Sequence, residues 1–130
     1  MFINILPDLP KKLQKREARV TPKVLKYFKE NYPNSVALEI KATKTNTISK
    51  SALKEHQCKA LIAVQSMSGL SYKIPDNSRI RLPFDAFQLK GTQSFVVACF
   101  LKERICLAID PKDWEGANSG SDCIFSFPLK

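Results

Sequence analysis

The clearest pattern along the chain is an apolar run, Val36-Ala37-Leu38-Glu39-Ile40-Lys41-Ala42-Thr43-Lys44, that contains a carboxylate and an ammonium two positions apart. The run is typical of a strand, in which successive side chains point to opposite faces. We therefore expect a strand over 35–43, with Ala37, Glu39 and Lys41 on one face and Leu38, Ile40 and Ala42 on the other. An apolar strand rarely places two charges on one face unless they have a role. A metal ligand beside a lysine that activates water is one such role.

Apolar residues recur at helical spacing on both sides of this strand. A first helix is predicted over 11–31, with Leu13, Val20, Val24, Leu25 and Phe28 as its apolar positions. Because proline is favoured at the first helical position after a threonine cap, Thr21-Pro22 makes this segment either two helices or one kinked helix. A second helix is predicted to follow a cap at Ser49 or Ser51 and to run to about Met67, with Leu53, Ala60, Leu61 and Val64 facing inward.

The second half of the chain changes character and predicts strands over 70–74, 82–89, 95–101 and 104–109. Turn residues separate these segments, and the last two strands are expected to form a hairpin. We expect a loop over 115–122 and an edge strand over 124–127. The order of helix, strand, helix and then several strands predicts an α/β or α+β sheet with helices packed against it. A chain of 130 residues corresponds to a single domain over 1–130.

The charge distribution adds a partner to this picture. The net charge is +9 in a chain of otherwise ordinary globular composition. Basic residues crowd the first predicted helix and continue through the next thirty positions. This predicts a polyanionic partner, with nucleic acid ahead of an acidic membrane, while a solvated helix face is the alternative. The residues expected to contact DNA are Lys12, Lys15, Arg16, Arg19, Lys44 and Lys54.

Targeting signals and cysteines narrow the class of protein. The apolar N-terminal hexapeptide has no basic region before it, and Asp8 and two prolines follow, so we expect no signal peptide. The later apolar run over 95–101 is far shorter than the roughly 20 residues that cross a bilayer, which predicts a soluble protein. The four cysteines show no paired close spacing. We expect buried thiols in a reducing, cytoplasmic compartment, with neither a zinc site nor disulfides.

The surroundings of Glu39-Ile40-Lys41 strengthen what is by itself a weak signal. A run rich in Lys and Thr follows it over 42–47, then a helix that contains Lys54-Glu55-His56-Gln57, and a basic helix with Arg16-Glu17 precedes it. This combination resembles the PD-(D/E)XK nuclease superfamily, and within it the Holliday junction resolvases of bacteria and their phages. The resemblance covers 11–64 and implies a restriction-endonuclease-like fold, a central mixed sheet flanked by helices.

The resemblance also implies roles for individual residues. In that family a strand carboxylate and an acidic partner bind Mg²⁺ or Mn²⁺, and the lysine orients or activates the attacking water. It implies that Glu39 is a metal ligand, Lys41 the lysine, and the backbone carbonyl of Ile40 a further ligand. Gln57 matches the helix glutamine that supports the lysine, and Glu17 the acidic residue on the first helix; His56 is a weaker candidate. A hard cation held by carboxylates suits phosphodiester cleavage, and a nearby lysine adds positive charge.

The acidic partner departs from the family's pattern. The family places this Asp on a strand hairpin immediately before Glu-x-Lys, whereas here the basic helix leads almost directly into the strand. Asp85, in Leu82-Pro83-Phe84-Asp85, is the preferred substitute and would enter from a neighbouring strand in a permuted order. Asp76 is the second choice. Asp8, in Pro7-Asp8, fits the letters of the motif but lies before the helix.

Two functions follow from these residues. The first is a metal-dependent endonuclease that hydrolyses phosphodiester bonds in DNA, prefers branched junctions and acts as a homodimer. The second is a non-catalytic DNA-binding module on the same fold, in which the missing upstream Asp marks a lost metal site. Each candidate also has a plainer reading: Glu39 and Lys41 as an exposed pair, Glu17 as an offset to its basic neighbours, His56 and Gln57 as surface residues, and Asp85 as a turn or cap residue.

Overall fold

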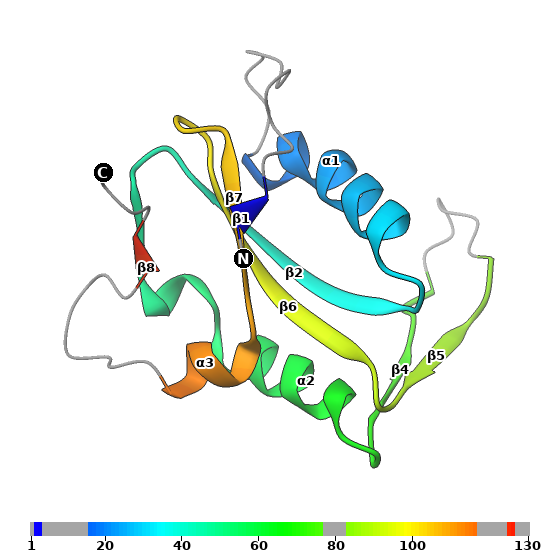
Figure 1. Cartoon of the computed structure of the whole chain (residues 1–130). Helices are drawn as coiled ribbons and strands as arrows, with labels where there is room; N and C mark the ends of the chain where they lie inside the picture. The colour runs from blue at the N-terminus through cyan, green and yellow to red at the C-terminus, as the bar shows by residue number, and fades with distance from the viewer. Residues whose placement is uncertain (1, 4–15, 77–82, 117–124, 127–130) are drawn as a thin grey trace.

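Figure 1 presents a computed structural model of the chain, which describes residues 2–3, 16–76, 83–116 and 125–126. The side chains are described for 20–76 and 83–116. In chain order the elements are β1 (Phe2–Ile3), α1 (Arg16–Asn31), β2 (Val36–Thr43), β3 (Thr47–Ile48), the 3₁₀ turn η1 (Lys50–Ala52), α2 (Glu55–Gln65), β4 (Leu70–Lys73), β5 (Ala86–Leu89), β6 (Gln93–Phe100), β7 (Ile105–Ile109), α3 (Pro111–Gly116) and β8 (Phe125–Ser126).

The central sheet has the strand order β1-β7-β6-β2. β2 runs parallel to β6, while β6–β7 and β7–β1 are antiparallel, so the sheet is mixed. Parallel neighbours need a crossover, and the crossover here contains α2 together with β4 and β5. The fold is therefore α+β, as the order of predicted elements indicated. The expected hairpin is confirmed as β6–β7.

Helices cover both faces of this sheet (Figure 1). α1 lies on one face, where Val20, Val24 and Phe28 pack with Val97 and Cys99 of β6. α2 and α3 lie on the other, where Cys58, Leu61 and Trp114 pack with Val96, Ala98 and Phe100. Because β6 is covered on both sides, its residues from Val96 to Phe100 are buried irrespective of which face they occupy.

The alternation predicted for β2 is confirmed by this packing. Leu38, Ile40 and Ala42 contact the cluster under α1, whereas Ala37 contacts the cluster under α2. Since Glu39 and Lys41 share a face with Ala37, they project on the α2 side.

The first predicted helix ends at Asn31 as expected, and 11–15 lie outside the described residues; the second helix differs from the prediction. α1 is one helix that continues through Pro22. Pro22 lies on the exposed side of this helix, whereas Val20, Val24 and Phe28 form a buried stripe. The expected start of the second helix at Ser49 or Ser51 is wrong. η1 ends at Ala52. Leu53 follows it with an extended backbone and a buried side chain, so α2 begins only at Glu55.

The strands of the second half also differ in their partners. β4 and β5 form a separate two-stranded sheet, and β3 pairs with β8 in another, which confirms an edge strand within 124–127. β5 begins at Ala86, so the predicted strand over 82–89 starts too early: 83–85 are described and are not part of a strand. α3 occupies part of the expected loop: 115–116 belong to this helix, and 117–122 lie outside the described residues.

Candidate functional site

Glu39 and Lys41 form an ion pair in the middle of β2. Lys41 Nζ lies 3.4 Å from Glu39 Oε1, and the two side chains are 18% and 30% exposed. The plainer reading of a fully solvated pair therefore does not describe them. A half-buried carboxylate needs hydrogen-bond donors or a cation, since burial removes part of its hydration.

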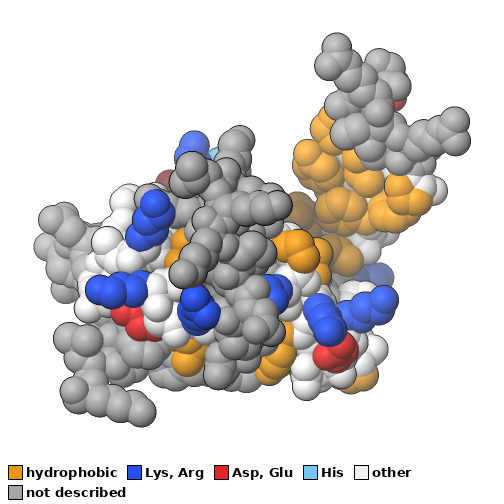
Figure 2. All heavy atoms as spheres, turned by 90° about the horizontal axis from the view of Figure 1, so that it is seen from above, with side chains coloured by type: hydrophobic (Ala, Val, Ile, Leu, Met, Phe, Trp, Pro, Cys, Tyr) orange, Lys and Arg blue, Asp and Glu red, His pale blue; other side chains and the backbone are white. Residues whose placement is uncertain are grey.

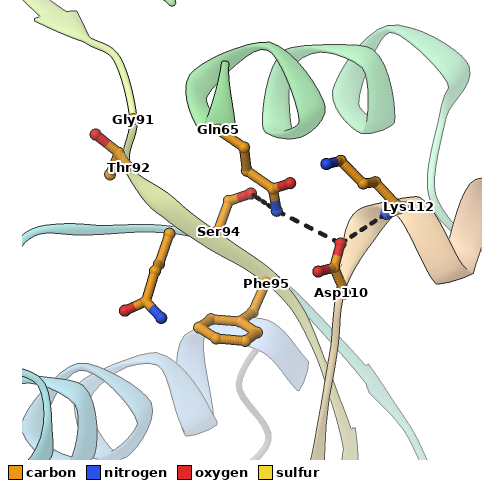
Figure 3. A pocket seen from close by; sticks show the side chains of 8 residues that line it. Gln65, Gly91, Thr92, Ser94, Phe95, Asp110 and Lys112 are labelled. Atoms are coloured by element: carbon orange, nitrogen blue, oxygen red, sulfur yellow. Dashed lines mark hydrogen bonds between the residues drawn. The ribbon is translucent and has the colours of Figure 1, made fainter. Parts of the chain in front are cut away.

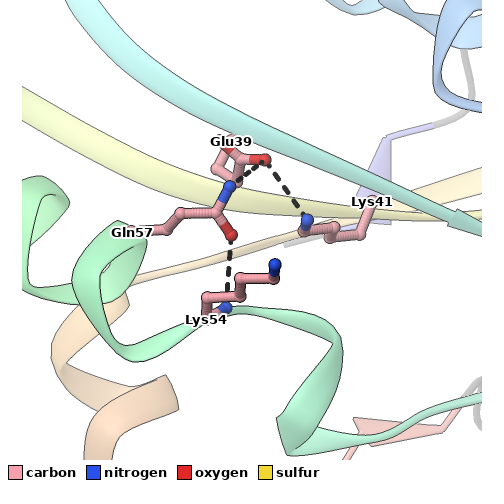
Figure 4. A network of polar contacts seen from close by, with 4 residues as sticks. All are labelled: Glu39, Lys41, Lys54 and Gln57. Atoms are coloured by element: carbon pink, nitrogen blue, oxygen red, sulfur yellow. Dashed lines mark hydrogen bonds and ion pairs between the residues drawn. The ribbon is translucent and has the colours of Figure 1, made fainter.

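Gln57 of α2 supplies a second donor to the same oxygen. Its Nε2 donates to Glu39 Oε1 at 3.4 Å, and its Oε1 accepts from the backbone N of Lys54 at 3.2 Å (Figure 4). The first turn of a helix has backbone N–H groups without helical acceptors, and the Gln57 carbonyl oxygen satisfies one of them. This bond leaves the amide nitrogen directed towards the strand. Gln57 thereby links the start of α2 to the charged face of β2.

Lys54 adds a second ammonium to this neighbourhood. Its side chain is exposed, and Figure 4 shows it on the side of Gln57 on which Lys41 lies. Gln57 and Lys41 both contact the Glu39 carboxylate, and with Lys54 beside them the two ammonium groups outnumber this single negative charge. Such an arrangement suits an anionic group such as a phosphate. We call Glu39, Lys41, Lys54 and Gln57 the Glu39 cluster.

The other predicted acidic residues do not join this cluster. Asp85 is exposed, immediately before β5, and its backbone O accepts from Ile74 N at 2.8 Å. Among the described strands, β2 pairs with β6, whereas β5 belongs to a separate sheet with β4. The expectation that Asp85 enters the site from a strand next to β2 is therefore wrong. Asp76 is exposed just after β4. Asp8 lies outside the described residues.

The remaining candidates are placed as follows. His56 is exposed on α2. Glu17 lies in α1, which packs on the face of the central sheet opposite to Glu39. The structure describes the backbone of Glu17 but not its side chain. Lys44 is exposed just after β2. The structure describes Arg16 and Arg19 by their backbone alone, as part of α1. Lys12 and Lys15 lie outside the described residues. In the described part of the chain no three His, Cys, Asp or Glu side chains gather as a metal-binding group.

Figure 2 shows Lys and Arg side chains spread over the face seen from above, with acidic side chains at fewer places. This agrees with the basic composition of the chain. Cys58, Cys99 and Cys106 are buried, as expected, and Cys106 Sγ lies 2.6 Å from Cys99 Sγ across the β6–β7 hairpin. Burial raises the pKa of the Cys58 thiol, and the nearby Glu115 carboxylate acts in the same direction.

A second group of polar residues, Ser94, Gln65 and Asp110, was not predicted from the sequence. Ser94 is buried, donates to Leu61 O at 2.7 Å and accepts from Gln65 Nε2 at 3.0 Å. The same nitrogen lies 3.4 Å from Asp110 Oδ1, beside an open cavity of about 350 Å³ (Figure 3). These bonds tie the end of α2 to β6 and to the start of α3. No local pattern signals them because the partners are 29 and 45 positions apart.

The fold and the site define an α+β domain with a half-buried cluster of one carboxylate, lysines and a glutamine. A scan against protein-family models, a search of curated proteins and a search of solved structures each found no match to this chain. Among the helices of the described residues, none is long and apolar enough to span a membrane.

Proposed function

We propose that the protein is a metal-dependent endonuclease that hydrolyses phosphodiester bonds in DNA and prefers branched substrates such as Holliday junctions. The observation that carries the proposal is the meeting of a strand Glu-x-Lys with a helix glutamine. Gln57 lies 18 positions from Glu39 in the chain, yet both Gln57 and Lys41 contact Glu39 Oε1. The same three residue types carry the resemblance to PD-(D/E)XK resolvases.

The oxygen ligands that this site offers suit a hard divalent cation. Glu39 offers a carboxylate and Ile40 a backbone carbonyl, and Mg²⁺ commonly completes such a set with waters and substrate phosphate oxygens. Mg²⁺ or Mn²⁺ held there would supply an acidified water and a positive charge that stabilises the transition state. The Glu39 carboxylate makes no other hydrogen bond or ion pair among the described residues.

The residues of the chain have separate tasks in this proposal. Lys41 donates hydrogen bonds that orient the attacking water and offset charge on the phosphate. Gln57 keeps the Glu39 carboxylate turned towards Lys41, because its own amide is fixed by the backbone of Lys54. Lys44, Lys54 and the basic side of α1 bind the DNA backbone.

The assembly follows from the same resemblance. We infer a homodimer, in which two copies of the site would cut paired strands symmetrically. We also propose a reducing, cytoplasmic location, because the four cysteines show no paired close spacing in the sequence.

Cleavage of a labelled four-way junction and a matched linear duplex, with Mg²⁺ or Mn²⁺, tests the proposal. We expect wild type to cut the junction faster. Glu39→Gln should cut at least 100-fold more slowly while it still binds DNA. Glu55→Gln is the matched control, because Glu55 is exposed on α2 and its ion pair within the described part of the chain is with Lys59.

The same assay identifies the second acidic ligand. Asp8→Asn is compared with Glu39→Gln, and loss of cleavage with retained DNA binding would make Asp8 this ligand. Asp76→Asn and Asp85→Asn, which lie outside the Glu39 cluster, should cut at the wild-type rate. Metal-dependent cleavage by Glu39→Gln at the wild-type rate would contradict the proposed site.

A non-catalytic DNA-binding module is the second candidate function. The absence of a group of three acidic or histidine ligands among the described residues favours it. Salt-sensitive DNA binding without metal-dependent cleavage of any substrate would establish it in place of the nuclease.

A further inference from the structure

The hairpin of β4 and β5, here called the arm, has one apolar face. Directly opposite residues of an antiparallel pair share a face, and successive pairs alternate between the two faces. Leu70 faces Leu89 and Tyr72 faces Phe87, so these four side chains form the apolar face. The intervening pairs, Ser71 with Gln88 and Lys73 with Ala86, form the other face.

The aromatic part of this face is exposed. Tyr72 is 48% exposed and Phe87 36%, and their stacked ring centroids lie 5.5 Å apart. Figure 1 shows the arm projecting from the central sheet, and Figure 2 shows its hydrophobic side chains at the upper right. A two-stranded sheet normally needs a further layer against its apolar face, and the described elements leave this one open.

The charge of the chain selects among the molecules that could cover the face. The segment from Leu70 to Lys90 contains Lys73, Arg79, Arg81 and Lys90 against Asp76 and Asp85. The whole chain carries +9, so two copies that meet through their arms would bring like charges together. A polyanion that also offers flat apolar surfaces matches both the charge and the exposed rings. Unpaired nucleic-acid bases have this chemistry, because aromatic side chains stack on them.

We propose that the arm binds unpaired DNA bases, which stack on Tyr72 and Phe87. This inference rests on the proposed action on DNA and adds the feature of the substrate that is recognised. A base inside a continuous duplex has both faces covered by its neighbours, so the arm discriminates in favour of gaps, flaps and branch points. It supplies a preference that the Glu39 cluster, which meets only a phosphate, cannot supply.

The arm is placed to act on the same substrate as the Glu39 cluster. It follows α2, whose first turn holds Gln57, and leads into β6, which pairs with β2 at Glu39. α2 has 11 residues, or roughly 16 Å at about 1.5 Å per residue. One DNA molecule can therefore reach both the arm and the cluster.

Metal-free binding of short DNA tests this inference separately from cleavage. The probes are a single-stranded 12-mer that contains 2-aminopurine and the matched duplex. We expect Tyr72→Leu/Phe87→Leu to bind the single strand roughly 10- to 100-fold more weakly than wild type, with loss of 2-aminopurine quenching, and to bind the duplex within about twofold. Leucine keeps the face apolar but removes the rings. Ser71→Ala/Gln88→Ala, on the opposite face of the same strands, should match wild type.

Several results would overturn the inference. Unchanged single-strand binding by the double leucine variant would do so, as would equal losses on single strand and duplex. If wild type sediments as a dimer and the double leucine variant as a monomer, the face is an interface between copies. An unchanged melting temperature shows that a loss does not come from unfolding. If the protein cleaves junctions but its single-strand binding does not depend on the two rings, the inference about the arm is wrong and the nuclease proposal stands. If binding depends on the rings but no cleavage occurs, the inference about the arm stands and the nuclease proposal is wrong.

Discussion

Gln57 connects two structural requirements through one amide. Its oxygen satisfies a backbone N–H at the start of α2, and its nitrogen donates to Glu39. Gln57→Glu retains the first bond but places a second carboxylate against Glu39, so we expect junction cleavage to fall roughly 10- to 100-fold, as for other residues that orient a ligand. DNA binding, followed by fluorescence anisotropy, should change little. Lys59→Gln, an exposed change on the same helix, is the control. Cleavage at the wild-type rate by Gln57→Glu would exclude the orienting role.

Cys58 illustrates burial at the residue scale. Its thiol donates to Pro111 O at 3.5 Å, and burial raises its pKa above the ordinary value. Less thiolate is then present at neutral pH, and the thiolate is the reactive form. We expect iodoacetamide to label Cys58 in the native protein at least tenfold more slowly than in guanidinium at pH 8, as followed by peptide mass spectrometry. The labelling rate should still be rising with pH above the pKa of an ordinary thiol. Equal rates in the two states would contradict the burial of this thiol.

Gly69 controls the arm at the scale of an element. Its φ is +69°, and a Cβ there would lie 2.2 Å from Leu89 O. Gly69→Ala therefore combines a strained backbone with a clash, which we expect to cost about 1–3 kcal/mol or more, concentrated in the arm. Amide hydrogen exchange of 70–73 and 86–89 should accelerate, while exchange in β6 should not. Gly116→Ala, where a Cβ meets no atom within 4 Å, is the control. Unchanged protection of the arm in Gly69→Ala would show that the turn can adapt.

Local patterns predicted the elements better than their partners. The alternation around Glu39 and Lys41 fixed their common face, because period two is a property of the strand itself. The position of Asp85 depends on β5 pairing with β4 and not with β2, a choice between distant segments that alternation cannot make. α3 had a usable signal: Asp110 before Pro111 is typical of a helix start, and Asp110 Oδ1 accepts from Lys112 N at 2.9 Å. Gln57 was named through the resemblance alone, since nothing in its local sequence indicates contact with a strand.

At the scale of the whole molecule, the proposed function assigns two kinds of DNA recognition to two surfaces. The face of β2 beside α2 holds charge at Glu39 and Lys41, whereas the arm presents exposed rings at Tyr72 and Phe87. Phosphate contacts position a nucleic acid without reading its structure, and base contacts add selectivity. A basic chain with both surfaces should thus bind all DNA through charge and select branched DNA through the arm.

This division predicts how salt acts on the intact protein. Binding to a linear duplex should weaken steeply with salt, with a slope of about −5 in log K against log salt if roughly six phosphates are contacted. Lys44→Gln/Lys54→Gln removes the exposed ammonium that follows β2 and the exposed ammonium of the Glu39 cluster, so the slope should become shallower by about 2, with equal losses on different duplex sequences. Lys112→Gln, on α3, should leave the slope unchanged. The double leucine variant of the arm should also keep the duplex slope, because its rings carry no charge. Titration by fluorescence anisotropy from 50 to 200 mM salt measures all four proteins. A wild-type slope in Lys44→Gln/Lys54→Gln would place the phosphate contacts elsewhere, on the basic residues of α1.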